Sequence, residues 1–323
     1  MGRNYYDIND SGVQRWSEIA ANNPPQTKVA ELPSYESWKE AKESPRPEQV
    51  RVLTFNIAVD GRFGLDGVTE LIRSSNADII GLQESGDSAK KIAASLGMKL
   101  IQTGKTTILT SLDVESSTPG GNGIIVKTEG GKNVAFFNRH LYHAPYQPYQ
   151  VLGIPYENGR FVSTEADAID EANKARGKDV EEVRKDIAEM KDQGLPTIVV
   201  GDFNEPSYLD WTDETVKAGR HPFKVEWPAT KSLADDGFKD SYREMHPDPV
   251  KNPGYTWTPT TKIDDPKDHH DRIDFILYRG ASMKVKSVDI IGEDVDNADI
   301  PFTPFPSDHR AVTAVFEVGD ARP

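Results

Sequence analysis

The chain has 323 residues, of which 36% are hydrophobic and 28% charged, a composition that suits a folded protein with a sizeable core. No stretch approaches the roughly 18 apolar residues of a membrane-spanning helix, and the absence of cysteine excludes disulfides and thiolate metal ligands. With 38 basic and 52 acidic residues the net charge is −14, which disfavours a polyanionic partner unless a local basic groove or bridging cations offset it.

Residues 1–49 are predicted to form an N-terminal extension docked on the rest of the chain, because several prolines break the segment and its aromatic residues favour packing. The first residues lack the apolar core of a secretory signal. This fits a cytoplasmic protein and equally a secreted one whose signal is missing from the sequence. One domain is expected over residues 50–318, followed by a short tail at 319–323.

Strand and helix patterns alternate from Val50 onward. The first elements are expected as a strand at 49–59, a helix at 66–75, a strand at 77–83, a helix at 85–96 and short strands near 98–102 and 106–110. The next are a strand pair around the Gly130–Gly131 turn, a long helix at 164–193 with a break at Gly177, and a buried strand ending in GDFN. Late strands are expected at 255–257, 272–278, 283–291 and 311–318. This order predicts an α/β domain with two sheets packed between helices.

Polar residues interrupt or follow the buried strands at six places, where a rigid backbone can support a site. These residues are Asn56 in LTFN, Glu84 after IIGLQ, His140 in NRHL, Asp202 and Asn204 in GDFN, Asp274 in DRIDFIL, and Asp308 with His309 in SDHR. Any one of them is explained as a turn or cap residue, but six interruptions together indicate a shared site.

The residue types of this set favour hydrolysis by water. Carboxylate, amide and imidazole groups without a thiol suit a hard cation such as Mg²⁺, Mn²⁺ or Ca²⁺. The sequence contains no cysteine nucleophile, no G-x-S-x-G elbow, no Walker loop and no G-x-G-x-x-G. Attack of water on a phosphorus centre, assisted by a metal and imidazoles, is therefore the economical chemistry.

These motifs resemble, in order and approximate spacing, those of the endonuclease/exonuclease/phosphatase superfamily over roughly residues 50–318. The resemblance implies the DNase-I-like fold, a four-layer α/β sandwich in which two mixed β-sheets are packed between helices. It also implies a metal-dependent hydrolase of phosphate esters. The family includes nucleases, abasic-site enzymes, sphingomyelinases and inositol-polyphosphate phosphatases, so the substrate stays open.

The resemblance assigns a metal site for Mg²⁺ or Mn²⁺, with Ca²⁺ as a further candidate. Glu84 is similar to the principal ligand of the family, Asn56 lies beside it, and Asp308 contributes to the same ion or to a second one. Asp60, four residues after Asn56, is a weaker candidate for a second ion.

The resemblance also assigns the acid–base groups. Asp202 would position and deprotonate the attacking water, and Asn204 would orient the water and the phosphate. His309 and His140 are similar to the imidazoles that face the phosphoryl oxygens. Asp274 would fix the tautomer of His309.

Several candidate substrate contacts have two readings. Arg272 reaches a phosphate or forms an ion pair with Asp271 or Asp274. The proline-rich insert after the His140 strand carries His143, Tyr146 and Tyr149, which stack on a substrate or pack on their own domain.

The remaining histidines are expected to be solvated or at the surface. His269 and His270, next to Asp271, resemble a metal site, but their acidic loop favours solvated side chains. His221 is expected on the surface.

The preferred function is hydrolysis of a small or non-polymeric phosphodiester or phosphomonoester, because of the acidic net charge and the aromatic insert. An endonuclease or exonuclease acting on DNA or RNA is the alternative. An alternative of another class is a binding module that kept the fold and lost catalysis, yet every motif position holds a competent residue. The expected partner is a phosphate-ester substrate, nucleic acid being the other possibility, and a monomer is expected.

Overall fold

The structure is a computed structural model that describes residues 49–104 and 106–319. The expectations for the extension before residue 49 and for most of the short C-terminal tail lie outside the described residues. The separate domain predicted for 50–318 stays a prediction, although its elements are described below. No described helix combines the length and the apolar character that crossing a bilayer requires.

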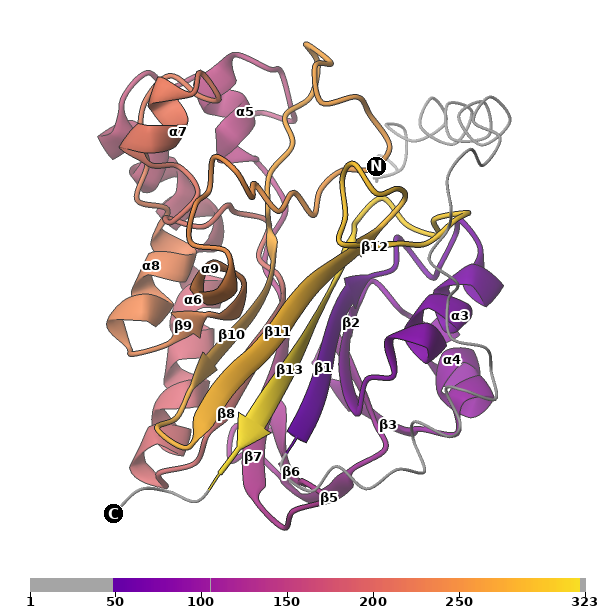
Figure 1. Cartoon of the computed structure of the whole chain (residues 1–323). Coiled ribbons are helices and arrows are strands. Elements are labelled where there is room, and N and C mark those ends of the chain that lie inside the picture. Colours follow the sequence, from indigo (N-terminus) through magenta and orange to yellow (C-terminus); the bar gives the residue numbers. More distant parts are fainter. Residues whose placement is uncertain (1–48, 105, 320–323) are drawn as a thin grey trace, which may run out of the picture.

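Two mixed β-sheets form the centre of the molecule (Figure 1). The strands of the first sheet are β1 (Gln49–Asn56), β2 (Ile79–Gln83), β3 (Lys99–Thr103), β4 (Thr106–Thr110), β11 (Met283–Gly292), β12 (Ile300–Pro301) and β13 (Ala311–Val318). The strands of the second are β5 (Asp113–Ser117), β6 (Gly123–Lys127), β7 (Asn133–His140), β8 (Thr197–Asp202), β9 (Lys239–Asp240) and β10 (Asp274–Arg279). Their orders are β12-β11-β13-β1-β2-β4-β3 and β5-β6-β7-β8-β10-β9.

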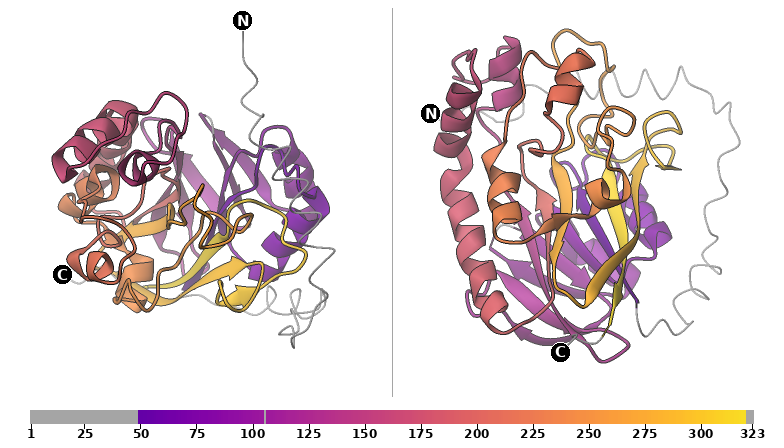
Figure 2. Two further views of the ribbon diagram at one scale, coloured as in Figure 1. Left: turned by 90° about the horizontal axis from the view of Figure 1, so that it is seen from above. Right: turned by 60° about the vertical axis from the view of Figure 1, so that its left-hand side comes forward.

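Helices cover the outer faces of both sheets, which gives four layers (Figures 1 and 2). On the first sheet lie α3 (Leu65–Ser75) and α4 (Ser88–Leu96), and on the second α6 (Glu165–Asp192) and α8 (Pro228–Asp235). Three short helices complete the set: α5 (Gln147–Leu152), α7 (Asp213–Lys217) and α9 (Ser241–Met245). The predicted four-layer α/β sandwich is confirmed.

The inner faces of the two sheets are held together by one apolar cluster. Val52 and Val312 of the first sheet belong to the same cluster as Phe136, Val200 and Ile276 of the second, and each is at most 2% exposed. Burying side chains of this size stabilises the fold by roughly 1.5–3 kcal/mol each. This packing fixes the ends of the strands that carry the polar residues.

Several expectations for the secondary structure differ from what is observed. The long helix α6 continues through Gly177, because a glycine costs only about 1 kcal/mol while the buried face of the helix packs on the second sheet. The strand expected at 255–257 is only an isolated bridge between Trp257 and Asp271. The hydroxyl of Thr256 accepts the N–H groups of residues 273 and 274 at this point and so replaces a strand ladder. Strand β5 was not predicted because all five of its residues are exposed and none alternates with a buried one.

Candidate active site

The carboxyl ends of β1, β2, β7 and β8 meet the starts of β10 and β13 at one edge of the sandwich. β1 runs parallel to β2, and β7 parallel to β8, so Asn56, Glu84, His140 and Asp202 all lie at strand ends. Asp202 lies opposite His140 on one neighbouring strand and opposite Asp274 on the other. The register of the second sheet therefore places three predicted site residues side by side.

The amide of Asn56 links the two sheets at this edge. Its Nδ2 donates to Oε1 of Glu84 at 3.1 Å and to Oδ2 of Asp202 at 2.9 Å, and lies 3.5 Å from Nε2 of His309. Its Oδ1 accepts the backbone N–H of Ala58. Asn56 is fully buried. In this arrangement Asn56 orients the carboxylates of Glu84 and Asp202. Its Oδ1, the atom that would bind a metal, already accepts a hydrogen bond from the backbone.

His309 and Asp274 form a buried pair. Nδ1 of His309 lies 3.0 Å from Oδ2 of Asp274, and Nε2 of the same ring lies 3.7 Å from Oδ2 of Asp202. Burial alone would lower the pKa of His309, but the charges of Asp274 and Asp202 raise it to about 10. The ring is therefore an imidazolium at neutral pH, with one N–H directed toward Asp202.

Asp202 is the anionic partner of this imidazolium. Burial favours its neutral form, but the charge of His309, the hydrogen bond from His140 and the backbone N–H of Asn204 outweigh burial and lower its pKa to about 2. The N–H of Asn204 reaches Oδ1 of Asp202 at 2.8 Å. The second oxygen, Oδ2, lies 3.5 Å from Nε2 of His140. Asp202 is thus a buried carboxylate surrounded by donors.

Two other carboxyl groups of the cluster have pKa values shifted in the opposite direction, those of Asp274 and Asp308; the cluster consists of Asn56, Glu84, His140, Asp202, Asn204, Asp274, Asp308 and His309. Burial, opposed by the charge of His309 and reinforced by Asp202, raises the pKa of Asp274. Burial, opposed by His309 and reinforced by the charge of Glu84, raises the pKa of Asp308. Like charges therefore repel one another here, which is the condition under which a divalent cation is bound favourably.

Two sets of groups at this edge have the chemistry to hold a cation. Ligand atoms of Asp202, Asp274 and His309 lie within 4.8 Å of one another. However, an imidazolium whose Nδ1 is bonded to Asp274 has no free lone pair for a metal. The carboxylates of Glu84 and Asp308 are hard oxygen donors of the type that a divalent cation prefers, and the charge of Glu84 acts on Asp308. Which of them bind a metal stays a prediction.

A left-handed turn holds Glu84 in place. Ala58, Val59 and Asp60 have φ values of 54°, 35° and 58°, a conformation that costs roughly 1–2 kcal/mol for each residue. The turn directs the N–H of Val59 at Oε2 of Glu84, 2.9 Å away, and the N–H of Asp60 at the Glu84 carbonyl, 2.7 Å away. Such strain persists only where neighbouring contacts fix it.

Asp60 itself is engaged by α4. Its Oδ1 accepts the N–H of Ser88 at 3.3 Å, and its carbonyl accepts the Ser88 hydroxyl at 2.8 Å. The structure therefore gives Asp60 the position of a clamp on the left-handed turn and lends no support to the weaker expectation of a second metal at this residue.

Arg272 does not face the cluster, which corrects both readings from the sequence. Its guanidinium is buried and forms ion pairs at 2.9 Å with Asp210 and at 2.8 Å with Asp240. The expected partners, Asp271 and Asp274, are not those it binds. A contact with phosphate would require this buried pair to open.

The aromatic insert packs on its own domain. Tyr146 and Tyr149 are 4% and 7% exposed, and both rings contact Trp257. The Tyr146 hydroxyl donates to Asp271, and that of Tyr149 to Asp268. The expectation that these rings stack on a substrate is therefore corrected. The alternative expectation, that they pack on their own domain, describes the structure.

His143 is the member of the insert that stays near the cluster. It is half-buried, and burial together with the charge of His140 lowers its pKa. Its substrate contact remains a prediction. Trp257, which the sequence did not single out, has its ring centroid 6.4 Å from that of His309. Trp257 therefore lies beside the cluster, supported by the tyrosines of the insert.

Two buried amide side chains, those of Gln83 and Asn138, were not predicted from the sequence to have a role at the site. Nε2 of Gln83 donates to Oδ1 of Asn138 at 2.6 Å, and Nδ2 of Asn138 donates to the carbonyls of Leu82 and Thr107. Both amide side chains are fully buried and tie the two sheets together. The available signal was a polar residue inside a buried strand, in LQE and in FFNRHL.

The other histidines are more buried than expected. His221, predicted at the surface, stacks on Trp211 with centroids 4.1 Å apart and is 7% exposed. His270 is 5% exposed and lies 2.9 Å from the Thr261 hydroxyl. The expectation of solvated side chains is therefore wrong for these two residues, whose surroundings come from loops that sequence periodicity does not describe.

Comparisons with known proteins agree with this geometry. The family model described as Endonuclease/Exonuclease/phosphatase family matches residues 53–309. The Caenorhabditis elegans protein named Uncharacterized protein F14F9.5 is 29% identical over 293 residues, which cover 82% of this chain and 90% of that protein. The structure of an AP endonuclease from Archaeoglobus fulgidus is similar at 17% identity and a TM-score of 0.53, covering 83% of this chain and 100% of the other.

A second solved structure, the endonuclease/exonuclease/phosphatase from Beutenbergia cavernae DSM 12333, is similar at 15% identity with a TM-score of 0.52, covering 85% of this chain and 72% of the other. At such identities the structural likeness concerns the fold, whereas the family match covers most of the chain. The chain belongs to the Endonuclease/Exonuclease/phosphatase family and is a hydrolase acting on phosphate ester bonds.

Proposed function

We propose that the chain is a metal-dependent phosphoesterase that hydrolyses small or non-polymeric phosphodiesters or phosphomonoesters by direct attack of water. The observation that carries the proposal is the convergence of Glu84, Asp202, His140, His309 and Asp274 at one strand edge. An anionic carboxylate and an imidazolium 3.7 Å apart are suited to accept a proton from water and to neutralise charge on a phosphoryl group.

In this proposal each polar side chain has a separate task. Asp202, with its low pKa, is the anionic acceptor for the proton of the attacking water, and Asn204 orients that water. His309 and His140 donate to the phosphoryl oxygens. Asp274 keeps His309 charged and holds its ring in position.

Glu84 and Asp308 would hold the divalent cation, with Mg²⁺ or Mn²⁺ favoured because the donors are hard oxygens. When bound, the cation supplies Lewis-acid polarisation of a phosphoryl oxygen. The left-handed turn at residues 58–60 would keep the Glu84 carboxylate directed at this position.

The preference for a small substrate is supported by the charge of the neighbouring loops. Residues 264–271 (DDPKDHHD) and 293–299 (EDVDNAD), which precede Asp274 and Asp308, each contain four acidic residues, and together they contain one lysine. Arg272, which directly follows the first loop, is already paired with Asp210 and Asp240, and Arg310, which follows His309, is paired with Glu293. A long polyanion would meet repulsion here, whereas a single phosphate group is neutralised by the cation and the imidazoles.

A substrate panel tests this proposal. Purified protein would be assayed with Mg²⁺ and with Mn²⁺ against bis-(p-nitrophenyl) phosphate, inositol phosphates, sphingomyelin, RNA and plasmid DNA at ~150 mM salt. We expect higher kcat/KM for a small ester than for duplex DNA. Efficient plasmid nicking with no turnover of small esters would support the nuclease alternative instead, and no turnover of any substrate would support the binding module.

A further inference from the structure

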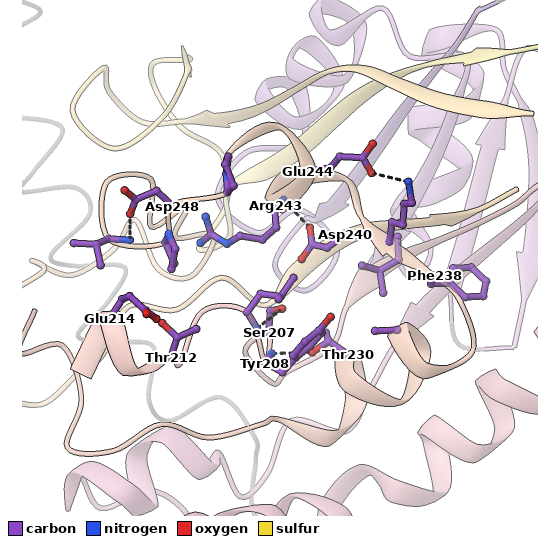
Figure 3. Close-up of a pocket in the computed structure, with 17 residues that line it drawn as sticks. Ser207, Tyr208, Thr212, Glu214, Thr230, Phe238, Asp240, Arg243, Glu244 and Asp248 are labelled. Atoms are coloured by element: carbon purple, nitrogen blue, oxygen red, sulfur yellow. Dashed lines mark hydrogen bonds and ion pairs between the residues drawn. The ribbon is translucent and has the colours of Figure 1, made fainter. Parts of the chain in front are cut away.

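A cavity of about 920 Å³ is lined by residues outside the proposed catalytic cluster. Figure 3 shows the residues that line it. Its walls come from α8, α9, the start of α7 and the loops at 207–209 and 247–250. None of the polar residues of the catalytic cluster contributes to its lining. Ligand sites of proteins typically measure roughly 300–1,000 Å³, so this cavity has room for a complete small molecule.

The wall of the cavity is predominantly apolar. Leu209, Phe238, Pro249, Val250 and Leu277 contribute to it, together with Tyr208 (Figure 3). Phe238 and Leu277 are 5% and 3% exposed and belong to the core that packs against the second sheet. The part of the wall formed by Phe238 and Leu277 is therefore held in place by the core. An apolar molecule bound against it would gain roughly 25 cal/mol of free energy for each Å² of apolar surface removed from water.

The charged groups at the buried end are neutralised within the protein. Nε of Arg243 lies 2.6 Å from Oδ1 of Asp210, and its other nitrogens donate to three backbone carbonyls. Asp240 forms an ion pair with Arg272 at 2.8 Å, and its other oxygen caps the N-terminus of α9. Neither residue offers an uncompensated charge to a ligand.

Two further acidic groups at the rim are engaged in the same way, whereas Glu214 is exposed to solvent and its side chain bonds to that of Thr212. Glu244 accepts the Tyr278 hydroxyl at 2.7 Å and lies 3.5 Å from the ammonium of Lys239. Asp248 pairs with Lys251 at 3.1 Å and accepts two backbone N–H groups. A charged ligand would lose its hydration here without gaining a counter-charge, which is costly.

From the size, the apolar wall and the internal pairing of these charges, we infer that this cavity binds an uncharged, largely apolar small molecule. The inference is independent of the proposed substrate, because the cavity and the catalytic cluster share no lining residue. Tyr208 is a polar group suited to a directional contact, since the residue is part of the wall and its side chain carries a hydroxyl.

Two fluorescent probes that differ by one sulfonate test the inference on the full chain. N-phenyl-1-naphthylamine is uncharged, and 1-anilinonaphthalene-8-sulfonate carries a negative charge. We expect saturable binding of the uncharged probe at one site per chain, at least tenfold tighter than binding of the sulfonate. Absence of saturable binding, or equal or tighter binding of the sulfonate, would overturn the inference.

Matched variants locate the probe. Ala234→Phe adds a ring at a residue that lines the cavity, and Ala94→Phe adds the same ring on the exposed face of α4. We expect Ala234→Phe to weaken binding of the uncharged probe at least tenfold and Ala94→Phe to leave it unchanged. If Ala234→Phe does not fold, Val250→Phe, on the loop side of the cavity, replaces it. Unchanged affinity in a folded cavity variant contradicts the site.

Discussion

Nδ1 of His309 lies 3.0 Å from Oδ2 of Asp274, and the same ring presents Nε2 to Asp202 at 3.7 Å. One carboxylate therefore fixes the orientation of the ring, and the other lies close enough to form an ion pair with it. The two contacts explain why the pKa of His309 rises to about 10 despite burial, which by itself lowers it. In the proposed mechanism, this holds a positive charge at the point where the phosphate binds.

Removing this charge is expected to impair turnover. His309→Ala should lower kcat a hundredfold or more, in line with typical contributions of positioned acid–base and electrostatic groups. Asp274→Asn keeps the ring but weakens its charge and should cost less. His246→Ala, which removes a half-buried histidine next to Tyr242, serves as control. Steady-state kinetics with circular dichroism check the effect, and near-normal kcat in folded His309→Ala would refute the assigned role.

Loss of the Glu84 carboxylate is expected to weaken metal binding. Glu84→Gln should raise the Mg²⁺ or Mn²⁺ concentration that gives half-maximal activity tenfold or more, because an amide is a poorer ligand for a hard cation. Glu70→Gln, at an exposed position of α3, should have no such effect. The wild type should lose activity in EDTA and regain it with either metal. Full activity in chelator would contradict metal dependence.

The clamp on the left-handed turn is expected to influence the same metal site. Ser88→Ala removes the 2.8 Å bond from the hydroxyl to the Asp60 carbonyl, which contributes about 1 kcal/mol. Metal affinity should fall several-fold as Glu84 loses its fixed position. Ser74→Ala removes a bond of equal length on α3, to the carbonyl of Leu71, and provides the control. Equal metal affinity in both variants would show that the turn holds Glu84 without Ser88.

Tyr146 is expected to act through packing. Tyr146→Phe deletes the 2.7 Å hydrogen bond to buried Asp271 and should lower the free energy of unfolding by about 1–3 kcal/mol while KM stays unchanged. Tyr278→Phe loses a bond of the same length to Glu244 and should behave alike. Urea unfolding and KM separate the two roles. A raised KM without loss of stability would return Tyr146 to the substrate site.

The fold, and the gathering of these polar residues at the strand ends, were largely predictable from the sequence because their signals are local. Each buried strand is a short apolar run, and a polar residue such as Asn56 or Asp202 stands out at its end. The resemblance then ordered these residues into one family pattern. The parallel pairing of β1 with β2 and of β7 with β8 converts that order into proximity.

The loops were not predictable because their contacts join distant segments. Arg272 binds Asp210 across 62 positions, and Tyr146 reaches Asp271 across 125. Neither contact leaves a periodic pattern in the chain. The left-handed turn at Ala58–Asp60 was not predictable either. Glycine is the usual sign of such a backbone, and none of these three residues is a glycine.

The central claim is that this cluster hydrolyses phosphate esters with Asp202 as the acceptor for the water proton. Its most direct test is the kcat of Asp202→Asn on bis-(p-nitrophenyl) phosphate with saturating Mn²⁺, beside the wild type and with circular dichroism of both. The account expects turnover by the wild type and a loss of a hundredfold or more in a variant with a native spectrum. Turnover by Asp202→Asn within a few-fold of the wild type would contradict it.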